Sequence, residues 1–307
     1  PARQRQLSPR ASRIAGGGGV TLAVFGAGGQ IGRALVERAG GAARGFDHAE
    51  SDICSPEAVA RALAIPDLSV VINCAAYTAV DRAEQEPERA FAVNATGAAN
   101  LAQMAAARCL PMIHLSTDYV YAGAGTAALN EDEPIAPLNV YGASKAAGDA
   151  AVAAANPAYL LLRVSWVFGV HGANFVKTMR RLGRDRPELR VVDDQRGGPT
   201  EARDIADAIL VMADACQRSG FDKWGAYHFA GAPSVSWYGF AEAIFAAGRG
   251  PRPSLVKIAT NEYPAAARRP LNSTLDCTRI RQTFGIDQPD WRKSLLRVID
   301  ELDKADQ

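Results

Sequence analysis

A chain of 307 residues is long enough to bury a sizeable core, as one extended domain or two smaller ones. Its 48% apolar and 22% charged residues are typical of globular proteins, and a net charge of +1 gives no reason to expect nucleic acid or an anionic membrane as partner. Five scattered cysteines without a C-x-x-C pair predict a reducing, cytoplasmic setting. Four histidines without ligand spacing predict no metal site, and no apolar run approaches the ~20 residues of a membrane span.

The N-terminal segment 1–19 is rich in Arg, Ser and Gly and has no hydrophobic periodicity. It is predicted to be a disordered extension. A transit peptide is the alternative, because the segment is Arg-rich and acid-poor, although it lacks a clear amphipathic helix. The folded part of the chain is therefore expected to begin at residue 20.

A glycine-rich turn follows the first apolar strand and precedes an amphipathic helix. Gly26, Gly29 and Gly32 stand at three-residue spacing in a G-x-x-G-x-x-G pattern. Such a turn lets the backbone approach a diphosphate, and the helix N-terminus offers free N–H groups and the positive end of its dipole. The alternative is a glycine turn without a ligand. The strand before it and the helix after it favour a dinucleotide site.

Strands and helices alternate beyond this unit, which predicts an α/β fold with a doubly wound parallel sheet. Further strands are predicted at 43–47, 68–73, 110–116 and 159–164, and helices at 56–63, at about 84–106 and within 137–155. After residue 166 the alternation weakens, with helices predicted at 175–182, 201–216 and 238–247 and a strand at 227–230. The Pro-rich segment 252–275 is predicted to be irregular. We expect a dinucleotide-binding domain over 20–166 and a mainly substrate-binding domain over 167–307, with some segments returning to the first sheet.

The pair Tyr141 and Lys145 forms a Y-x-x-x-K motif within the helix predicted in 137–155. Residues four apart share one face of a helix, so the phenol and the ammonium can address the same space. A nearby ammonium lowers the pKa of a tyrosine, which would make Tyr141 a usable proton donor near neutral pH. An exposed helix pair without a catalytic role is the alternative.

Two polar positions lie at predicted strand ends, where open α/β sheets bind their ligands. Ser116, Thr117 and Asp118 end the fourth strand, and a hydroxyl there could bond a substrate carbonyl. Asp47 ends the second strand, 21 residues after Gly26, where a carboxylate would meet the adenosine ribose. A plain turn or helix cap is the alternative at each position.

In this order and on these elements, the features resemble the extended short-chain dehydrogenase/reductase superfamily. Longer stretches resemble the dTDP-4-dehydrorhamnose reductase family, and the resemblance runs from about Val20 to Trp291. These stretches are 73–81 (NCAAYTAVD), 116–121 (STDYVY), 137–142 (PLNVYG), 163–168 (RVSWVF), 194–200 (DQRGGPT) and 267–273 (ARRPLNS).

The resemblance implies a catalytic set of three residues: Thr117 polarises the C4 carbonyl, Tyr141 delivers the proton, and Lys145 holds the nicotinamide ribose and tunes Tyr141. It implies further cofactor contacts from the glycine turn and from the ends of the second and third strands, namely Gly26, Gly29, Gln30, Ile31, Gly32, Asp47, Asp52, Ile53, Ala75, Ala76 and Tyr77. It also implies substrate contacts from Thr117, Asp118, Trp166 and Arg268.

Two of the implied roles have alternatives. Trp166 could instead be a core aromatic residue. Asn94 matches a superfamily position that supports the active-site lysine, but it could be a polar residue bonded within its own helix.

The implied reaction is reduction of the C4 keto group of a nucleotide sugar by NADPH or NADH, most readily dTDP-4-dehydro-L-rhamnose to dTDP-L-rhamnose. Cofactor choice stays open, because His48 follows Asp47 where many family members carry a basic residue. The alternatives are another reductase or epimerase of the superfamily, or a non-catalytic NADP-binding regulatory subunit of methionine adenosyltransferase. A dTDP-sugar is the expected partner, nucleic acid and membrane are not, and a homodimer is left open.

Overall fold

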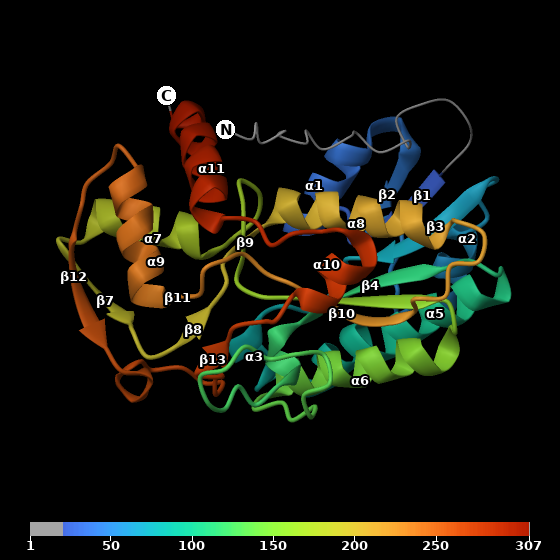
Figure 1. The fold of residues 1–307 in the computed structure, drawn as a ribbon, viewed down its shortest axis with the longest axis horizontal. Helices are drawn as coiled ribbons and strands as arrows, with labels where there is room; N and C mark the ends of the chain where they lie inside the picture. Colours follow the sequence, from blue (N-terminus) through green and yellow to red (C-terminus); the bar gives the residue numbers. More distant parts are fainter. Residues whose placement is uncertain (1–20, 307) are drawn as a thin grey trace, which may run out of the picture.

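The structure, a computed structural model, describes residues 21–306 (Figure 1). The predicted N-terminal extension lies outside these residues. The central sheet has six parallel strands in the order β10-β5-β4-β3-β1-β2. Their bounds are β1 Thr21–Phe25, β2 Ala43–Phe46, β3 Leu68–Asn73, β4 Met112–Thr117, β5 Tyr159–Val164 and β10 Gly225–Phe229. The strand order reverses between β1 and β3, and ligands of such sheets bind in the crevice at that point.

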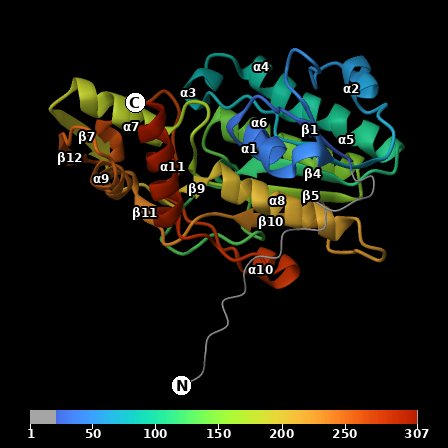
Figure 2. The ribbon, with the colours of Figure 1, turned by 90° about the horizontal axis from the view of Figure 1, so that it is seen from above.

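Helices cover both faces of the sheet (Figure 2). One face packs against α1 (Gln30–Ala39), α8 (Ala202–Cys216) and α10 (Thr278–Phe284). The other packs against α2 (Pro56–Ala62), α5 (Ala98–Ala107) and α6 (Val140–Ala155). Buried aliphatic side chains of β1 and β3 are wholly inaccessible on both faces, as expected for strands of a parallel sheet.

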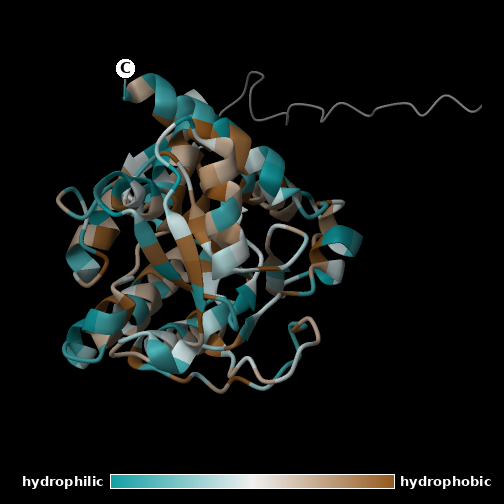
Figure 3. Ribbon diagram, turned by 90° about the vertical axis from the view of Figure 1, so that its left-hand side faces the viewer, coloured by the Kyte–Doolittle hydropathy of each residue, from teal (hydrophilic) through white to brown (hydrophobic). Residues whose placement is uncertain are grey.

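A second, smaller lobe lies beside the sheet and has its own core. Its helices are α7 (Phe175–Asp185), α9 (Trp237–Ala247) and α11 (Trp291–Ala305), packed beside the parallel pair β7 (Glu188–Val192) and β12 (Ser254–Ile258). Figure 3 shows hydrophilic and hydrophobic residues alternating along α11, whose buried side includes Trp291, Leu295 and Val298. Short pairings complete the lobe: β6 (Val167–Phe168) with β9 (Thr200–Glu201), and β8 (Arg196–Gly197) with β11 (Val235–Ser236) and β13 (Asn272–Ser273).

The chain passes between the two lobes repeatedly. After α7 and β7 it returns to the large sheet as α8 and β10, and α8 packs against α1. It then builds α9 and β12, returns once more as α10, and ends in the second lobe as α11. Each lobe is therefore assembled from separate stretches of sequence.

Two predicted elements are wrong. The helix expected at about 84–106 is instead α4 (Pro87–Phe91), a π-helical turn η3 (Ala92–Gly97) and α5, because Pro87 starts a new helix at its first turn. A short helix α3 (Val80–Ala83) ends before it. Segment 252–275 is not irregular throughout, since β12 pairs with β7 in it and a 3₁₀ turn η5 (Thr260–Glu262) follows. No helix in the described range 21–306 is both long and apolar enough to cross a membrane.

Candidate active site

The glycine turn is held by the ends of three strands. Gly26 has a φ of 76°, and a Cβ there would lie 2.5 Å from the Ala75 backbone nitrogen. A Cβ on Gly32 would lie 2.2 Å from the Gly26 carbonyl oxygen, so helix α1 packs directly against the turn. Gly29 is the N-cap of α1 and supplies no side-chain cap, which leaves the first N–H groups of the helix for a ligand.

A cavity of about 550 Å³ opens at this turn, at the carboxyl ends of β1, β2 and β3. The sequence predicted most of its lining: Gly26, Gly29, Asp47, Asp52, Ile53, Ala75, Ala76 and Tyr77. Arg89 of α4 also lines it, 5.8 Å from the centre of the Tyr77 ring, and no motif had pointed to it. The cavity combines exposed backbone, an acidic group and an apolar wall, which suits a dinucleotide.

The other predicted cofactor residues do not line this cavity. Gln30, Ile31 and Gly32 form the first turn of α1, and the Gln30 side chain bonds Asn174 of the second lobe at 2.9 Å. Tyr141 and Lys145 lie on α6 and belong to the polar cluster described next. Their contacts with a cofactor remain predictions.

Thr117 and Tyr141 meet where β4 ends and α6 begins. Thr117 is the last residue of β4, and its hydroxyl donates to Asp118 Oδ1 at 3.0 Å. It also lies close enough to the Tyr141 phenol to oppose the rise in the pKa of Tyr141. Tyr141 lies in the first turn of α6, which Asn139 caps by accepting from the Gly142 N–H at 2.7 Å. Burial raises the pKa of Asp118 to about 6, and no described group bonds its Oδ2.

Lys145 is buried one turn further along α6. Its ammonium donates to the Leu115 carbonyl at 2.6 Å and lies 3.2 Å from His114 Nε2. Burial lowers the pKa of Lys145 to about 8. The shared helix face predicted for Tyr141 and Lys145 is present, since both lie on α6 four residues apart.

The expected lowering of the tyrosine pKa is absent. Burial raises the pKa of Tyr141 above its ordinary value, and the carboxylates of Asp118 and Asp149 act in the same direction. The physical reason is that Lys145 is bonded to the Leu115 carbonyl and so does not offset the burial of the phenol. Tyr141 is consequently protonated near neutral pH, the form in which a proton donor must start.

Asn94 connects the cofactor cavity to α6. Its side chain accepts from the Tyr77 N–H at 2.8 Å and donates to the Tyr77 carbonyl at 3.0 Å and to Ser144 Oγ at 2.9 Å. The alternative of a bond within its own helix is therefore wrong. Asn94 bonds Ser144 rather than Lys145 itself, so any support for the lysine acts through the neighbouring residue.

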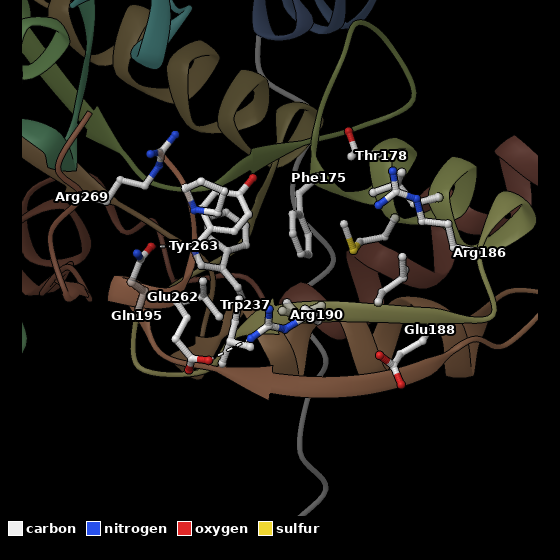
Figure 4. Close-up of a pocket in the computed structure, with 17 residues that line it drawn as sticks. Phe175, Thr178, Arg186, Glu188, Arg190, Gln195, Trp237, Glu262, Tyr263 and Arg269 are labelled. Carbon is white, nitrogen blue, oxygen red and sulfur yellow. Dashed lines mark hydrogen bonds and ion pairs between the residues drawn. The ribbon is translucent and has the colours of Figure 1, made fainter. Parts of the chain in front are cut away.

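A second cavity of about 610 Å³ lies in the smaller lobe, beside α7 and β7 (Figure 4). Phe175 and Trp237 stand side by side in it with ring centres 4.6 Å apart, and Arg269 and Arg186 lie on opposite sides of them. Arg190 pairs with Glu262 at 2.9 Å on the β7 side. An aromatic wall and several guanidinium groups suit a base linked to a diphosphate.

Arg269, rather than Arg268, lines this cavity. Arg269 pairs with Asp81 and lies close enough to the Tyr119 phenol to oppose the rise in the pKa of Tyr119. The Tyr119 ring packs edge-on against Tyr141 with centres 5.7 Å apart. The Arg268 side chain is exposed, and the backbone carbonyl of Arg268 accepts from the Asn139 side chain. Arg269 thus links the second cavity to the cluster at Thr117 and Tyr141.

Trp166 lies behind the cavity wall. Its ring stacks on Trp237 at 3.4 Å with an angle of 7° between the planes, and its φ is 48°. Gly197 makes room for it, since a Cβ there would lie 2.6 Å from the indole. The predicted substrate contact of Trp166 remains a prediction, while Trp237 and Gln195, joined by a 3.1 Å bond, line the cavity without having been singled out.

A glycine-turn cavity on a doubly wound sheet, with a Thr, Tyr and Lys cluster beyond it, defines an NAD(P)H-dependent oxidoreductase of the extended short-chain dehydrogenase/reductase class. The sequence profile of the RmlD substrate binding domain matches residues 20–304. The chain belongs to this family, and three of its curated relatives are named dTDP-4-dehydrorhamnose reductase.

The relatives match the chain over nearly its whole length. A curated dTDP-4-dehydrorhamnose reductase from Aggregatibacter actinomycetemcomitans is 42% identical over 90% of this chain and 97% of its own. A crystal structure of such a reductase from Clostridium acetobutylicum has a TM-score of 0.87 at 35% identity, covering 92% of this chain and 99% of that one. The Bacillus anthracis enzyme in complex with NADP has a TM-score of 0.85 at 35% identity with the same coverage.

Proposed function

We propose that the protein reduces the C4 keto group of dTDP-4-dehydro-L-rhamnose to give dTDP-L-rhamnose, with NADPH or NADH as the hydride source. The observation that carries the proposal is the position of Thr117 and Tyr141. They are linked through Tyr119 and Arg269 to the aromatic and arginine-lined cavity, while Asn94 links α6 to the glycine-turn cavity. Family membership supports the same reaction.

The glycine-turn cavity suits the dinucleotide. Gly28 and Gly29 line it with bare backbone, and the N-terminus of α1 carries no side-chain cap, so a diphosphate can approach the helix. Asp47 lines the same cavity and would accept from a ribose diol, while its Oδ1 accepts from the Ala49 and Glu50 N–H groups. The dinucleotide supplies the hydride, which a protein side chain cannot provide.

Two side chains would then act on the carbonyl and a third on the cofactor. Thr117 donates a hydrogen bond to the C4 oxygen, Tyr141 gives it a proton as negative charge develops, and Lys145 holds the nicotinamide ribose. Asp118 lies beside them with a buried oxygen that no described group bonds, which suits a sugar hydroxyl. These roles rest on the arrangement at the start of α6.

The second cavity would take the dTDP part of the substrate. Trp237 and Phe175 offer flat apolar faces to the base, and Arg269 offers a fork of N–H donors to the diphosphate. Ligands that bind only the folded state raise its thermal stability. Stabilisation by dTDP should therefore exceed that by ADP or UDP, and equal shifts with all three would remove the thymidine assignment.

Turnover decides between catalysis and a non-catalytic role. Purified protein is mixed with NADPH or NADH and a panel of 4-keto nucleotide sugars, and the loss of reduced-nicotinamide absorbance is followed. The expected result is fastest oxidation with dTDP-4-dehydro-L-rhamnose. Faster oxidation with another sugar would make the protein a different reductase of the superfamily. NADPH binding without oxidation of any sugar would support a regulatory role.

A further inference from the structure

A chain of buried polar side chains starts at Lys145 on α6 and connects this helix to β4 and β5. Lys145 Nζ lies 3.2 Å from His114 Nε2, which lies 3.9 Å from Asp149 Oδ1. Asp149 Oδ2 in turn accepts from Arg163 Nε at 3.1 Å. Each of the four residues is at most 5% exposed. His114 and Asp149 line neither of the two cavities described above.

The hydrogen on the His114 ring can be assigned from its neighbours. Asn73 Oδ1 accepts from the Ala75 N–H at 3.0 Å, so its amide nitrogen is the group facing His114 Nδ1, also at 3.0 Å. Nδ1 is therefore an acceptor. Burial lowers the pKa of His114 well below its ordinary value, so the ring is neutral. A neutral imidazole carries one N–H, and here it is on Nε2, facing Lys145.

This N–H conflicts with a charged lysine. An ammonium has three donors and no acceptor, so Nε2–H and a charged Lys145 present two donors to each other at 3.2 Å. A neutral amine has a lone pair and can accept from Nε2–H while still donating to the Leu115 carbonyl. Asp149 Oδ1 is the other acceptor near Nε2, at 3.9 Å, and no described group bonds it.

We propose that His114 is a positioning residue for the reduction, whose Nε2–H bonds the neutral amine of Lys145 after that residue has passed a proton toward Tyr141. The proposal rests on the proposed function. The Tyr141 phenol gives its proton to the C4 oxygen as the hydride arrives, and the phenolate takes a proton from the Lys145 ammonium. The neutral amine then regains a proton from solvent, and Nε2–H is left to Asp149.

Several groups face Lys145 and set its charge. Asp149 on α6 and Cys74 after β3 favour the ammonium, whereas burial and the Nε2–H of His114 on β4 favour the neutral amine. Tyr141 lies on the same helix, and Arg163 of β5 is engaged by Asp149. Removing Nε2–H takes away the donor that opposes the ammonium, while Asp149 still favours it, so Lys145 should keep its proton to higher pH.

The test compares His114→Asn and His114→Gln with wild type across pH. The amide of Asn stands near the Nδ1 position and can still bond Asn73, but it does not reach Lys145. The upper-pH limb of the kcat profile, where Lys145 loses its proton, should move up by roughly one unit. The longer Gln side chain reaches Lys145 and can turn its amide oxygen to the ammonium. The upper-pH limb of the kcat profile of His114→Gln should therefore move up at least as far. NADPH affinity should stay within a few-fold of wild type.

His228→Asn is the matched control. His228 is also wholly buried, and its Nε2 lies 2.7 Å from the Tyr121 hydroxyl, which accepts from Arg163 at 2.6 Å. None of the hydrogen bonds of His228 in the described residues reaches Lys145 or His114. Its loss should lower the unfolding temperature and leave the pH limb in place. The proposal would be overturned if the upper-pH limb of the kcat profile stayed in place in both His114 variants. It would also be overturned if His228→Asn shifted this limb by the same amount.

A second measurement needs no active variant. Nitrogen-15 NMR of the four wild-type histidines reports which ring nitrogen carries hydrogen. The Nε2–H form of His114 at pH 7 is expected, and an imidazolium or an Nδ1–H form would overturn the proposal. If wild type failed to oxidise NADPH with any keto sugar, the proposed function would fail, while the NMR result would still decide the assignment on which the His114 role depends.

Discussion

Arg269 donates a bidentate pair of hydrogen bonds to Asp81, with Nη2 2.7 Å from Oδ2 and Nη1 3.1 Å from Oδ1. The two residues are 188 positions apart in the sequence. Asp81 lies on α3, just after the loop that lines the glycine-turn cavity, and Arg269 lines the cavity of the smaller lobe. Asp81 thus fixes the orientation of a guanidinium that we expect to face the substrate.

Arg269→Lys should weaken substrate binding. Lysine keeps the charge but cannot form the two-point pair, and a hydrogen bond to a charged group contributes about 1.5–3 kcal/mol. The KM for the keto sugar should rise at least tenfold, with a smaller change in kcat. Steady-state kinetics checks this. Arg268→Lys is the matched variant, because Arg268 is predicted from the sequence to contact the substrate but its side chain is exposed. An equal rise in KM in both variants would mean that both arginines contact the substrate.

Tyr141→Phe should abolish most turnover without unfolding the protein. The ring and its edge-on packing against Tyr119 remain, but the proton donor is lost. General acid catalysis contributes on the order of a hundred- to ten-thousandfold, so kcat should fall by about that factor. Cofactor Kd, measured by fluorescence, should stay within a few-fold. Turnover close to wild type would mean that the proton comes from another group.

Asp118→Asn should stabilise the protein at neutral pH. Burial raises the folded-state pKa of Asp118 to about 6, so the protonated form is favoured by folding. Asp118 therefore contributes fully to the free energy of unfolding below the pKa of the unfolded state, about 3.9, and this contribution is lost as pH rises through 6. Asparagine mimics the protonated acid. The variant should therefore have the same free energy of unfolding as wild type below pH 4, and a free energy of unfolding higher by about 2–3 kcal/mol above pH 7.

Denaturant unfolding of wild type and Asp118→Asn at pH 4, 5.5 and 8 measures this advantage. A difference in unfolding free energy that does not change with pH would show that Asp118 keeps an ordinary pKa. Turnover of the same variant is an independent readout, because we also expect Asp118 to contact the sugar.

Asp47→Ala should raise the ratio of kcat/KM for NADPH over NADH. Asp47 lines the glycine-turn cavity, and its carboxylate would repel a ribose 2′-phosphate. Arg44, beside it, is paired with Glu50 at 3.0 Å. Glu50→Gln should release this arginine and raise the same ratio by a smaller factor. Unchanged ratios in both variants would show that the cofactor ribose lies elsewhere, and a hundredfold wild-type preference for NADPH would contradict the expected use of NADH.

The strands and most cavity residues could be predicted because local patterns determine them. Apolar runs bounded by turns locate β1, β3 and β5, and parallel strands bring Gly26, Asp47 and Ala75 to one edge. Strand β12 was missed because its short, largely exposed sequence becomes a strand only through pairing with distant β7.

Side-chain direction could not be predicted, since it depends on partners far along the chain. Nothing in the stretch ARRP separates Arg268 from Arg269, and it is Asp81 that turns the second one into the cavity. The Y-x-x-x-K spacing likewise places Lys145 on the face of Tyr141 but does not reveal that the Leu115 carbonyl holds its ammonium.

The repeated passage of the chain between the lobes also determines what happens when a protease cleaves the backbone once. A single cleavage in the loop before α9 would leave two fragments that each contain part of the large sheet or its covering helices and part of the smaller lobe. Strand β12 would still pair with β7, and α9 would still pack against α7, across the break. Limited proteolysis should therefore yield a nicked but associated protein, and the two lobes cannot be obtained as separate polypeptides by dividing the gene at one position.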